Sequence, residues 1–413
     1  MMNLHAQTNA TDNGDKISDL EKQNQDLRKR LDALENIVQK QGLSAATNGD
    51  PPVAAATDFS ISGFVTASYF HDSSEPHGNH ISPGYLWNRV NDSISINKIK
   101  LTFASPPVER SGDKFDVAYR VSFIAGQDAP IVNTSSATIG FQYLREAYLE
   151  MNVPIGTGLN ITAGELISLL NYESGDGGAA NANFSQGFQW FFTGNPPSAA
   201  IQAGYQFTDQ VGVKLRVQNG LYAGPIDNNS SKTFVGEVTL KPIKDVWVNL
   251  IGFGGREDVA FAQDVFGGSL LGGWQATEKL SFGTELDYFV FYNSQALVGT
   301  ALNGDSDVYS MGLWTTYDFT KEVGLALRTE FLSDAKGVDA SGGALGLMNP
   351  FGTGQDITSA ALTLDYKPIS RIKIQPEIRF DHTSWSHGWD PVNAFAYGKQ
   401  NRFIFGAGAS YLF

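Results

Sequence analysis

From residue 58 to the C-terminus, apolar and polar residues alternate along short segments, and no helical period replaces this alternation. A period of two is typical of a β-strand that has one apolar and one polar face. We assign sixteen such segments, at residues 59–70, 93–104, 115–126, 140–153, 158–167, 199–207, 210–219, 232–242, 245–254, 263–275, 279–292, 307–319, 322–333, 356–367, 371–382 and 400–413. This repetition limits the chain to a large β architecture with two chemically different faces.

The connections between these segments alternate in length. Long ones follow the odd-numbered segments, at 71–92, 127–139, 168–198, 220–231, 255–262, 293–306, 334–355 and 383–399. Most of the others contain only a few residues, as at Thr208–Asp209 and Thr320–Lys321, and the first is longer. Long loops at one end and tight turns at the other predict antiparallel hairpins in up-and-down order. A sheet of this size leaves two exposed edges unless it closes on itself.

The chemistry of the two faces indicates which side of the closed sheet meets solvent. In the segment 371–382, Ile374 and Ile378 lie on one face, whereas Lys373 and Glu377 lie on the other. An apolar interior this wide could not be filled by side chains. The reverse arrangement, with apolar residues outside and charged residues inside, is stable in lipid. We therefore predict an all-β fold, a 16-stranded antiparallel transmembrane β-barrel, with aromatic girdles near both ends of the strands.

The first 57 residues follow a different pattern. We expect a disordered N-terminus at 1–14, an α-helical coiled coil for oligomerisation at 15–41, and a linker of small residues and proline at 42–57. Spacings of three and four residues form the a/d seam of a coiled coil, which consists of Ile17, Leu20, Asn24, Leu27, Leu31, Leu34 and Val38. Asn24 at an a position would fix the register, and dimer and trimer stay open. The alternative is an amphipathic helix packed on its own domain.

The composition excludes several functional classes. A net charge of −14 argues against a nucleic-acid partner, because phosphate binding needs clustered Lys and Arg. The chain has no Cys, which excludes disulfides, thiolate metal sites and a Cys nucleophile. It contains no GxSxG, P-loop or dinucleotide fingerprint, and we predict no enzymatic activity. Residues Met1 to Gln7 lack the apolar core of a signal peptide, so they do not themselves indicate export.

Several stretches of the sequence resemble the OmpL-like β-barrel porin family of bacterial outer membranes. They are GELISLLNYES (164–174), RVQNGLYAGPIDNNSSKTFVGEV (216–238), LALRTEFLSDAKG (325–337), KIQPEIRFDHTSW (373–385) and the C-terminal strand, which ends in aromatic residues at 411 and 413. The likeness spans roughly residues 58–413. It implies an outer-membrane channel for passive diffusion of small hydrophilic solutes or ions, surrounded by lipid and lipopolysaccharide. With the coiled coil on the periplasmic side, we expect a homotrimer.

The connection 168–198 takes the place of the third external loop, which folds inward in sixteen-stranded porins and forms the constriction. It supplies Glu173 and Asp176, a Gly-rich stretch and several aromatic residues, but no basic residue. The alternation predicts basic residues on the facing wall, namely Arg120, Lys214, Arg216, Arg328 and Arg379. An acidic loop opposite a basic wall would set a transverse electric field across the channel. The alternative is that each charge pairs with a neighbour and merely solvates the lumen.

Histidines gather in the first and last long connections, as His71, His77, His80, His382 and His387. Closure of the barrel would bring these connections together at the extracellular mouth, where imidazole and carboxylate groups could bind a divalent metal. The spacings match no known metal motif, and the alternative is exposed histidines without fixed geometry. We expect no other cofactor.

Two other functional classes remain open at the level of the sequence. One is a structural envelope tether or adhesion protein whose barrel is mainly an anchor. The other is a soluble all-β trimer, for which extraction would not need detergent. Stepwise conductance in planar bilayers distinguishes the channel from the tether.

Overall fold

The computed structural model describes most of the barrel segment and a few residues before it. The described residues are 22, 25, 28, 29, 59–75, 81–82, 85, 90–134, 140–194, 196–223, 225–227, 229–259, 262–292, 305–334, 355–384, 389 and 398–413. The chain divides into two units, Met1–Phe59 and Ser60–Phe413. In the first unit, residues 22, 25, 28 and 29 have helical backbone and exposed side chains. The predicted seam from Ile17 to Val38 lies outside the described residues, so the coiled coil stays a prediction.

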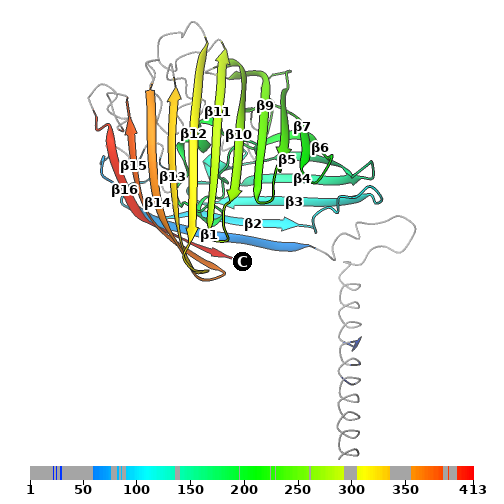
Figure 1. Ribbon diagram of the computed structural model, residues 1–413, viewed down its shortest axis with the longest axis horizontal. Coiled ribbons are helices and arrows are strands. Elements are labelled where there is room, and N and C mark those ends of the chain that lie inside the picture. Colours follow the sequence, from blue (N-terminus) through cyan, green and yellow to red (C-terminus); the bar gives the residue numbers. More distant parts are fainter. Residues whose placement is uncertain are drawn as a thin grey trace, which may run out of the picture. The chain divides into compact units, whose positions relative to one another are not determined.

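Sixteen antiparallel strands close into one barrel within the described residues, each paired with its neighbours in sequence (Figure 1). The strands are β1 (Ser60–Asp72), β2 (Ser93–Ala104), β3 (Asp116–Ala125), β4 (Leu144–Val153), β5 (Leu159–Leu166), β6 (Ser198–Gln206), β7 (Val211–Gln218), β8 (Thr233–Leu240), β9 (Val246–Val259), β10 (Ala262–Gln275), β11 (Leu280–Tyr292), β12 (Ser306–Asp318), β13 (Val323–Asp334), β14 (Gln355–Ile369), β15 (Ile372–Thr383) and β16 (Asn401–Leu412). β1 pairs with β16, for example at Phe64 and Leu412, which closes the barrel. The predicted barrel is confirmed.

Short helices occur within the long connections. They are α2 (Ala129–Val132), η2 (Gly177–Ala179) and α3 (Phe188–Thr193). Within the part of the chain that the structure describes, no helix has the length and apolar character needed to cross a membrane.

The barrel exposes its apolar side chains and buries its charged ones. On β7 and β8, Leu215 is 68% exposed and Phe234 is 62% exposed. The next residues along these strands alternate inward, and among them Arg216 and Glu237 are buried. This arrangement confirms the predicted apolar outer face, which is the face that lipid requires.

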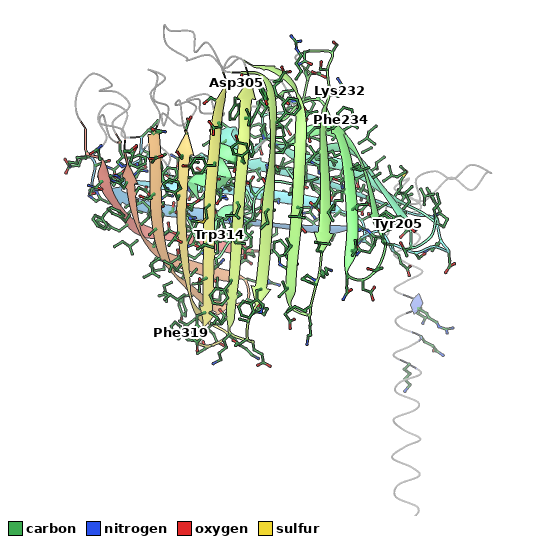
Figure 2. All side chains as sticks on the ribbon, turned by 45° about the horizontal axis from the view of Figure 1, so that its top comes forward. Tyr205, Lys232, Phe234, Asp305, Trp314 and Phe319 are labelled. Atoms are coloured by element: carbon green, nitrogen blue, oxygen red, sulfur yellow. The ribbon has the colours of Figure 1, made fainter. Side chains whose placement is uncertain are left out.

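The aromatic residues predicted for the two girdles lie on the outer face. Phe207 and Phe319 are exposed at the turn end of the barrel, and Tyr288 and Phe403 are exposed near the loop end. Figure 2 shows Phe319 at one end of the strands, and Lys232 and Asp305 at the opposite end.

The connection predicted at 255–262 is wrong. β9 continues to Val259 and β10 begins at Ala262, and Gly255 pairs with Val265 across this hairpin. The stretch GGRED at 254–258 interrupts the apolar alternation and therefore resembles a loop. Backbone pairing with β10 nevertheless extends the strand, because cross-strand contacts rather than local pattern decide where a ladder ends.

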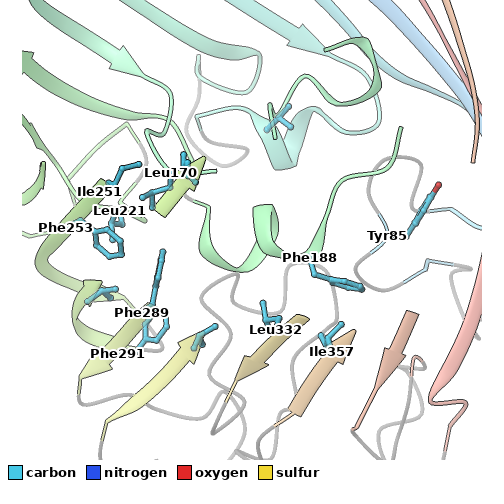
Figure 3. Packing of buried hydrophobic residues seen from close by; sticks show 14 of the residues in the cluster. Tyr85, Leu170, Phe188, Leu221, Ile251, Phe253, Phe289, Phe291, Leu332 and Ile357 are labelled. Carbon is cyan, nitrogen blue, oxygen red and sulfur yellow. The ribbon is translucent and has the colours of Figure 1, made fainter. Parts of the chain in front are cut away.

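Apolar residues also fill part of the interior, at the loop end of β8–β14. The cluster includes Val235, Ile251, Phe253, Phe289, Phe291, Leu332 and Ile357 from the strands, with Leu170, Phe188 and Leu221 from the loops (Figure 3). These inward aromatic residues depart from the polar interior that the alternation predicts. They give the long loops an apolar surface to pack on inside the barrel.

Candidate functional site

The long loop between β5 and β6, residues 167–197, lies inside the barrel; we call it the lumen loop. Its backbone N–H groups donate to carboxylates on the inner wall. The Tyr172 N–H donates to Glu285 Oε2 at 2.6 Å, and the Phe184 N–H donates to Glu377 Oε2 at 2.9 Å. We call the inner face of β11–β15 under this loop the covered wall; Trp314 lies on it, and its buried polar residues include Glu285, Asp287, Arg328, Glu330, Glu377 and Arg379.

Arg328 joins the lumen loop to the covered wall. Its Nη1 lies 2.9 Å from Glu173 Oε1 and donates to the Ser185 carbonyl at 2.6 Å. Glu173 Oε1 also accepts a hydrogen bond from Trp314 Nε1 at 3.1 Å. Arg328 Nε lies 3.0 Å from Glu330 Oε2, close enough for an ion pair but without the angle of a hydrogen bond. The predicted facing of Glu173 and Arg328 therefore occurs as a buried contact, because the Arg328 side chain is 0% exposed.

Arg379 belongs to a second buried group of charges at the closing seam of the barrel. Its Nε donates to Asp381 Oδ1 at 2.6 Å, and its guanidinium carbon lies 4.4 Å from the centre of the Phe188 ring on α3. Arg402 on β16 donates to Asp381 Oδ2 at 2.9 Å and to Asp72 Oδ2 on β1 at 3.2 Å. These ion pairs link β15, β16 and β1, and the cation–π contact holds α3 against them.

Asp176 pairs with a lysine that was not predicted. Lys100 on β2 donates to Asp176 Oδ2 at 2.6 Å. The pairing of β1 with β2 shifts between Thr66 and Ala67, so a bulge at Asn97 precedes Lys100 and sets its inward direction. A bulge of one residue changes which side chains face inward, and the sequence alternation alone does not reveal it.

The inner face of β3–β8, which we call the open wall, carries two basic side chains that are partly exposed, whereas others on it, such as Arg216, are buried. Arg120 Nε lies 2.7 Å from Glu146 Oε1, and the Arg120 side chain is 37% exposed. Lys214 Nζ lies 2.7 Å from Glu237 Oε1, and the Lys214 side chain is 34% exposed. These basic groups reach the aqueous interior, whereas Arg328 on the covered wall does not.

Arg216 on the open wall has neutral acceptors. It donates to Gln202 Oε1 at 2.8 Å and to the Ile167 carbonyl at 2.8 Å. A cavity of 240 Å³ lies along this wall. Its polar lining consists of Arg110, Glu146, Tyr148, Glu150, Asn160, Thr162, Gln202, Lys214 and Arg216. The open wall therefore offers a polar surface with paired charges, and among the described residues the Arg216 guanidinium has no carboxylate partner.

The structure divides the predicted constriction residues into groups. Glu173, Arg328 and Arg379 lie at the covered wall, Asp176 pairs with Lys100, and the open wall carries Arg120, Lys214 and Arg216. No ion pair among the described residues joins Glu173 or Asp176 to the open wall. A common role of these residues as one constriction stays a prediction.

A row of aromatic and glycine residues on the inner wall was not predicted. Four paired residues form one row across neighbouring strands. In order from β9 to β12, they are Trp247, Gly273, Gly283 and Trp314. Tyr172 of the lumen loop lies between the tryptophans, with ring centres 6.1 Å from Trp247 and 4.6 Å from Trp314. Burial, followed by the nearby charge of Glu173, raises the pKa of the Tyr172 hydroxyl above its usual range. Two inward glycines opposite two inward tryptophans are the sequence feature that could have indicated this row.

The described histidines face outward. His71 Nδ1 lies 2.8 Å from Asp92 Oδ1, and His382 Nδ1 lies 2.7 Å from Asn401 Oδ1. Among the described residues, no group of three or more His, Cys, Asp or Glu is arranged to hold a metal ion. His77, His80 and His387 lie outside the described residues, so the predicted metal site stays a prediction.

The chain is similar to known outer-membrane proteins. The family model described as "Putative beta-barrel porin-2, OmpL-like" matches residues 58–413. No curated protein matches the chain. Among solved structures, the outer membrane channel DcaP of Acinetobacter baumannii has a TM-score of 0.56 at 14% identity, over 87% of this chain and 98% of that one. The anion-selective porin from Comamonas acidovorans has a TM-score of 0.55 at 10% identity, over 86% and 99%. OmpT of Vibrio cholerae has a TM-score of 0.52 at 13% identity, over 86% of this chain and 97% of that one. At these identities the likeness shows the fold.

Proposed function

The chain belongs to the OmpL-like β-barrel porin family, and we propose that its water-filled pathway runs along the open wall. It is an outer-membrane porin, a channel for passive diffusion of small hydrophilic solutes or ions. The observation that supports the pathway is the difference in exposure between the walls. The side chains of Arg120 and Lys214 are 37% and 34% exposed, whereas those of Arg328 and Arg379 are 0% exposed.

The charge of the open wall favours a modest preference for anions. Glu146 and Glu237 neutralise Arg120 and Lys214, whereas Arg216 has neutral hydrogen-bond acceptors. The net charge of −14 for the whole chain has little influence here, because charges farther away than about 8 Å are screened at physiological salt. Selectivity therefore depends on the charges that line the pathway.

The reversal potential in a KCl gradient tests this proposal. Wild-type channels in planar bilayers are expected to favour chloride, and Arg216→Gln is expected to shift the reversal potential toward that of potassium. The control is Arg371→Gln, which removes an exposed arginine in the turn between β14 and β15. Equal reversal potentials in wild type and Arg216→Gln would contradict the proposed pathway.

Assembly through the N-terminal segment belongs to the same proposal. The heptad spacing over 15–41 supports oligomerisation, and we propose a homotrimer with the coiled coil on the periplasmic side. Light scattering of the detergent-extracted protein measures its mass. The double substitution Leu27→Asp and Leu31→Asp is expected to reduce that mass, whereas Gln25→Ala at an exposed position is expected to leave it unchanged.

The histidines of the first and last long connections remain the proposed site of a divalent metal at the extracellular mouth. Only His71 and His382 of this set are described, and both point outward. Titration calorimetry with zinc tests the site, and the absence of any binding heat at neutral pH would end this part of the proposal.

A further inference from the structure

The aromatic row, Trp247, Tyr172 and Trp314, lies on the inner wall toward the turn end of the channel. A Cβ added at Gly273 would lie 2.3 Å from Trp247 Nε1, and one added at Gly283 would lie 2.2 Å from Tyr172 Cζ. Each ring therefore rests directly on the backbone of the neighbouring strand, and glycine is the residue that leaves room for it. Trp314 is labelled in Figure 2 on β12.

The ring of Trp247 is partly free, whereas Trp314 stacks on Tyr172. The planes of Trp247 and Tyr172 are within 8° of parallel, but a centre-to-centre distance of 6.1 Å means that these two rings are strongly offset. The Trp314 ring centre lies 4.6 Å from that of Tyr172 in a stacked arrangement. Trp247 is half-buried with its ring against the backbone of Gly273, so it is the ring that we expect a ligand to reach.

A cavity of 580 Å³ lies beside these rings. This volume is in the range of sites for small organic molecules, which is about 300–1,000 Å³. The inward residues Trp247, Gly273, Gln275 and Ser281 line it, together with Tyr172, the turn between β8 and β9, and the outward residues Val246, Trp274 and Phe282. The cavity therefore lies at the rim of the barrel at its turn end, which is the periplasmic end in outer-membrane barrels.

The same turn supplies two ammonium groups. Lys241 and Lys244 line the cavity and are exposed, and neither has an ion-pair partner among the residues that the structure describes. Asp245 is the one carboxylate among the lining residues, so positive charge exceeds negative charge at this site. The Tyr172 hydroxyl adds no negative charge, because the ordinary pKa of a tyrosine is about 10.

We propose that Trp247, Tyr172, Lys241 and Lys244 form a binding site for flat organic anions, in particular aromatic carboxylates. The ring of the ligand would stack on Trp247 beside Tyr172, and its carboxylate would face the two ammonium groups. The site deepens the proposed function, because it requires an open aqueous pathway that reaches the turn end of the barrel. It would raise the local concentration of such anions at one mouth of the channel.

Single-channel recording tests this site with benzoate as the probe, added on the turn side of full-length channels in planar bilayers. Wild-type current is expected to show brief interruptions that saturate with benzoate concentration. Trp247→Leu is expected to weaken the apparent affinity at least tenfold, whereas Trp247→Phe, which keeps a ring, retains most of it. The double substitution Lys241→Gln and Lys244→Gln is expected to weaken it as well, and more so at low salt.

Matched controls separate this site from nonspecific effects. Tyr288→Leu removes an aromatic ring from the outer face, and Lys279→Gln with Lys321→Gln removes two exposed turn lysines that do not line the cavity. Both are expected to leave the interruptions unchanged. Cyclohexanecarboxylate, which has the charge but no flat aromatic face, is expected to interrupt the current more weakly than benzoate.

The outcomes separate this inference from the proposed pathway. Equal interruptions in wild type and Trp247→Leu, or equal potency of benzoate and a neutral sugar such as glucose, would overturn the anion site. If benzoate does not interrupt the current of wild-type channels that conduct KCl, the anion site is also overturned, whereas the proposed pathway is not affected. The proposed pathway is contradicted by a different result, namely equal reversal potentials in wild type and Arg216→Gln. That measurement does not involve the aromatic row.

Discussion

The two walls of the lumen carry ion pairs of the same residue types, but these pairs differ in their exposure to water. On the covered wall, Arg328 and Glu173 form an ion pair whose side chains are 0% and 3% exposed. On the open wall, Lys214 and Glu237 form an ion pair of similar length in which the lysine is 34% exposed. Breaking a buried ion pair strongly destabilises the fold, because it leaves an uncompensated charge without water. An exposed ion pair contributes little to stability.

The difference shows that inward direction alone does not make a charged residue part of a pore. The lumen loop covers the charges of β11–β15 and also reaches Lys100 on β2, whereas Arg120 on β3 and Lys214 on β7 stay partly exposed. Substitutions on the two walls should therefore separate stability from selectivity, with stability effects that decrease from the covered wall to the open wall.

The largest loss of stability is expected for Arg328→Leu. Removing one partner of a buried ion pair leaves an uncompensated charge and costs about 3–5 kcal/mol, here at Glu173 and Glu330. The lumen loop should also leave the covered wall, so single-channel conductance should rise and fluctuate. Urea unfolding in lipid vesicles measures the first effect, with Arg371→Leu in an exposed turn as the control. Equal stability of the two variants would show that the pair does not hold the loop.

A smaller loss is expected for Gly283→Ala. The added methyl group would lie 2.2 Å from Tyr172 Cζ, and overpacking of this kind costs about 1–3 kcal/mol. The matched control is Gly252→Ala on the outer face of β9, where an added Cβ has no atom within 4 Å. Unfolding of both variants under the same conditions compares them. If they unfold alike, the aromatic row is not packed as described.

The smallest loss of stability is expected for Arg110→Gln at the edge of the open wall. Arg110 Nη2 lies 3.3 Å from Glu150 Oε1, with side chains that are 53% and 21% exposed. Exposed pairs of this kind contribute about 0.2–1 kcal/mol. The reversal potential should nevertheless shift toward that of potassium, because Arg110 lines the open cavity. A stability loss as large as that of Arg328→Leu would remove the distinction between the two walls.

The strands and their inward residues could be predicted from the sequence, because an alternation of two residues is local. Arg216, Arg328 and Arg379 face inward as the alternation predicts, and the lengths of the connections predicted the topology. The sequence predicted that Glu173 faces a set of basic wall residues, but it could not single out Arg328 among them, since the two residues are 155 positions apart. The pairing of Asp176 with Lys100 was missed for the same reason.

Exceptions to the alternation were also beyond prediction. The bulge before Lys100 and the continuation of β9 to Val259 depend on pairing with the next strand rather than on local composition. The inward aromatic residues Phe253 and Phe289 gain their burial from loops that fold into the barrel. Such features arise from contacts that no single segment contains.

The central claim, that solutes pass along the open wall, is tested most directly by thiol accessibility. The chain has no Cys, so single-cysteine variants carry one reactive group. Lys214→Cys places a thiol on the open wall, and Ser310→Cys places one on β12 beside Asp287, where the native serine is 4% exposed. A charged, membrane-impermeant thiol reagent applied to open channels is expected to change the current of Lys214→Cys stepwise and to leave Ser310→Cys unaffected. Rapid modification of Ser310→Cys together with an unreactive Lys214→Cys would contradict the account.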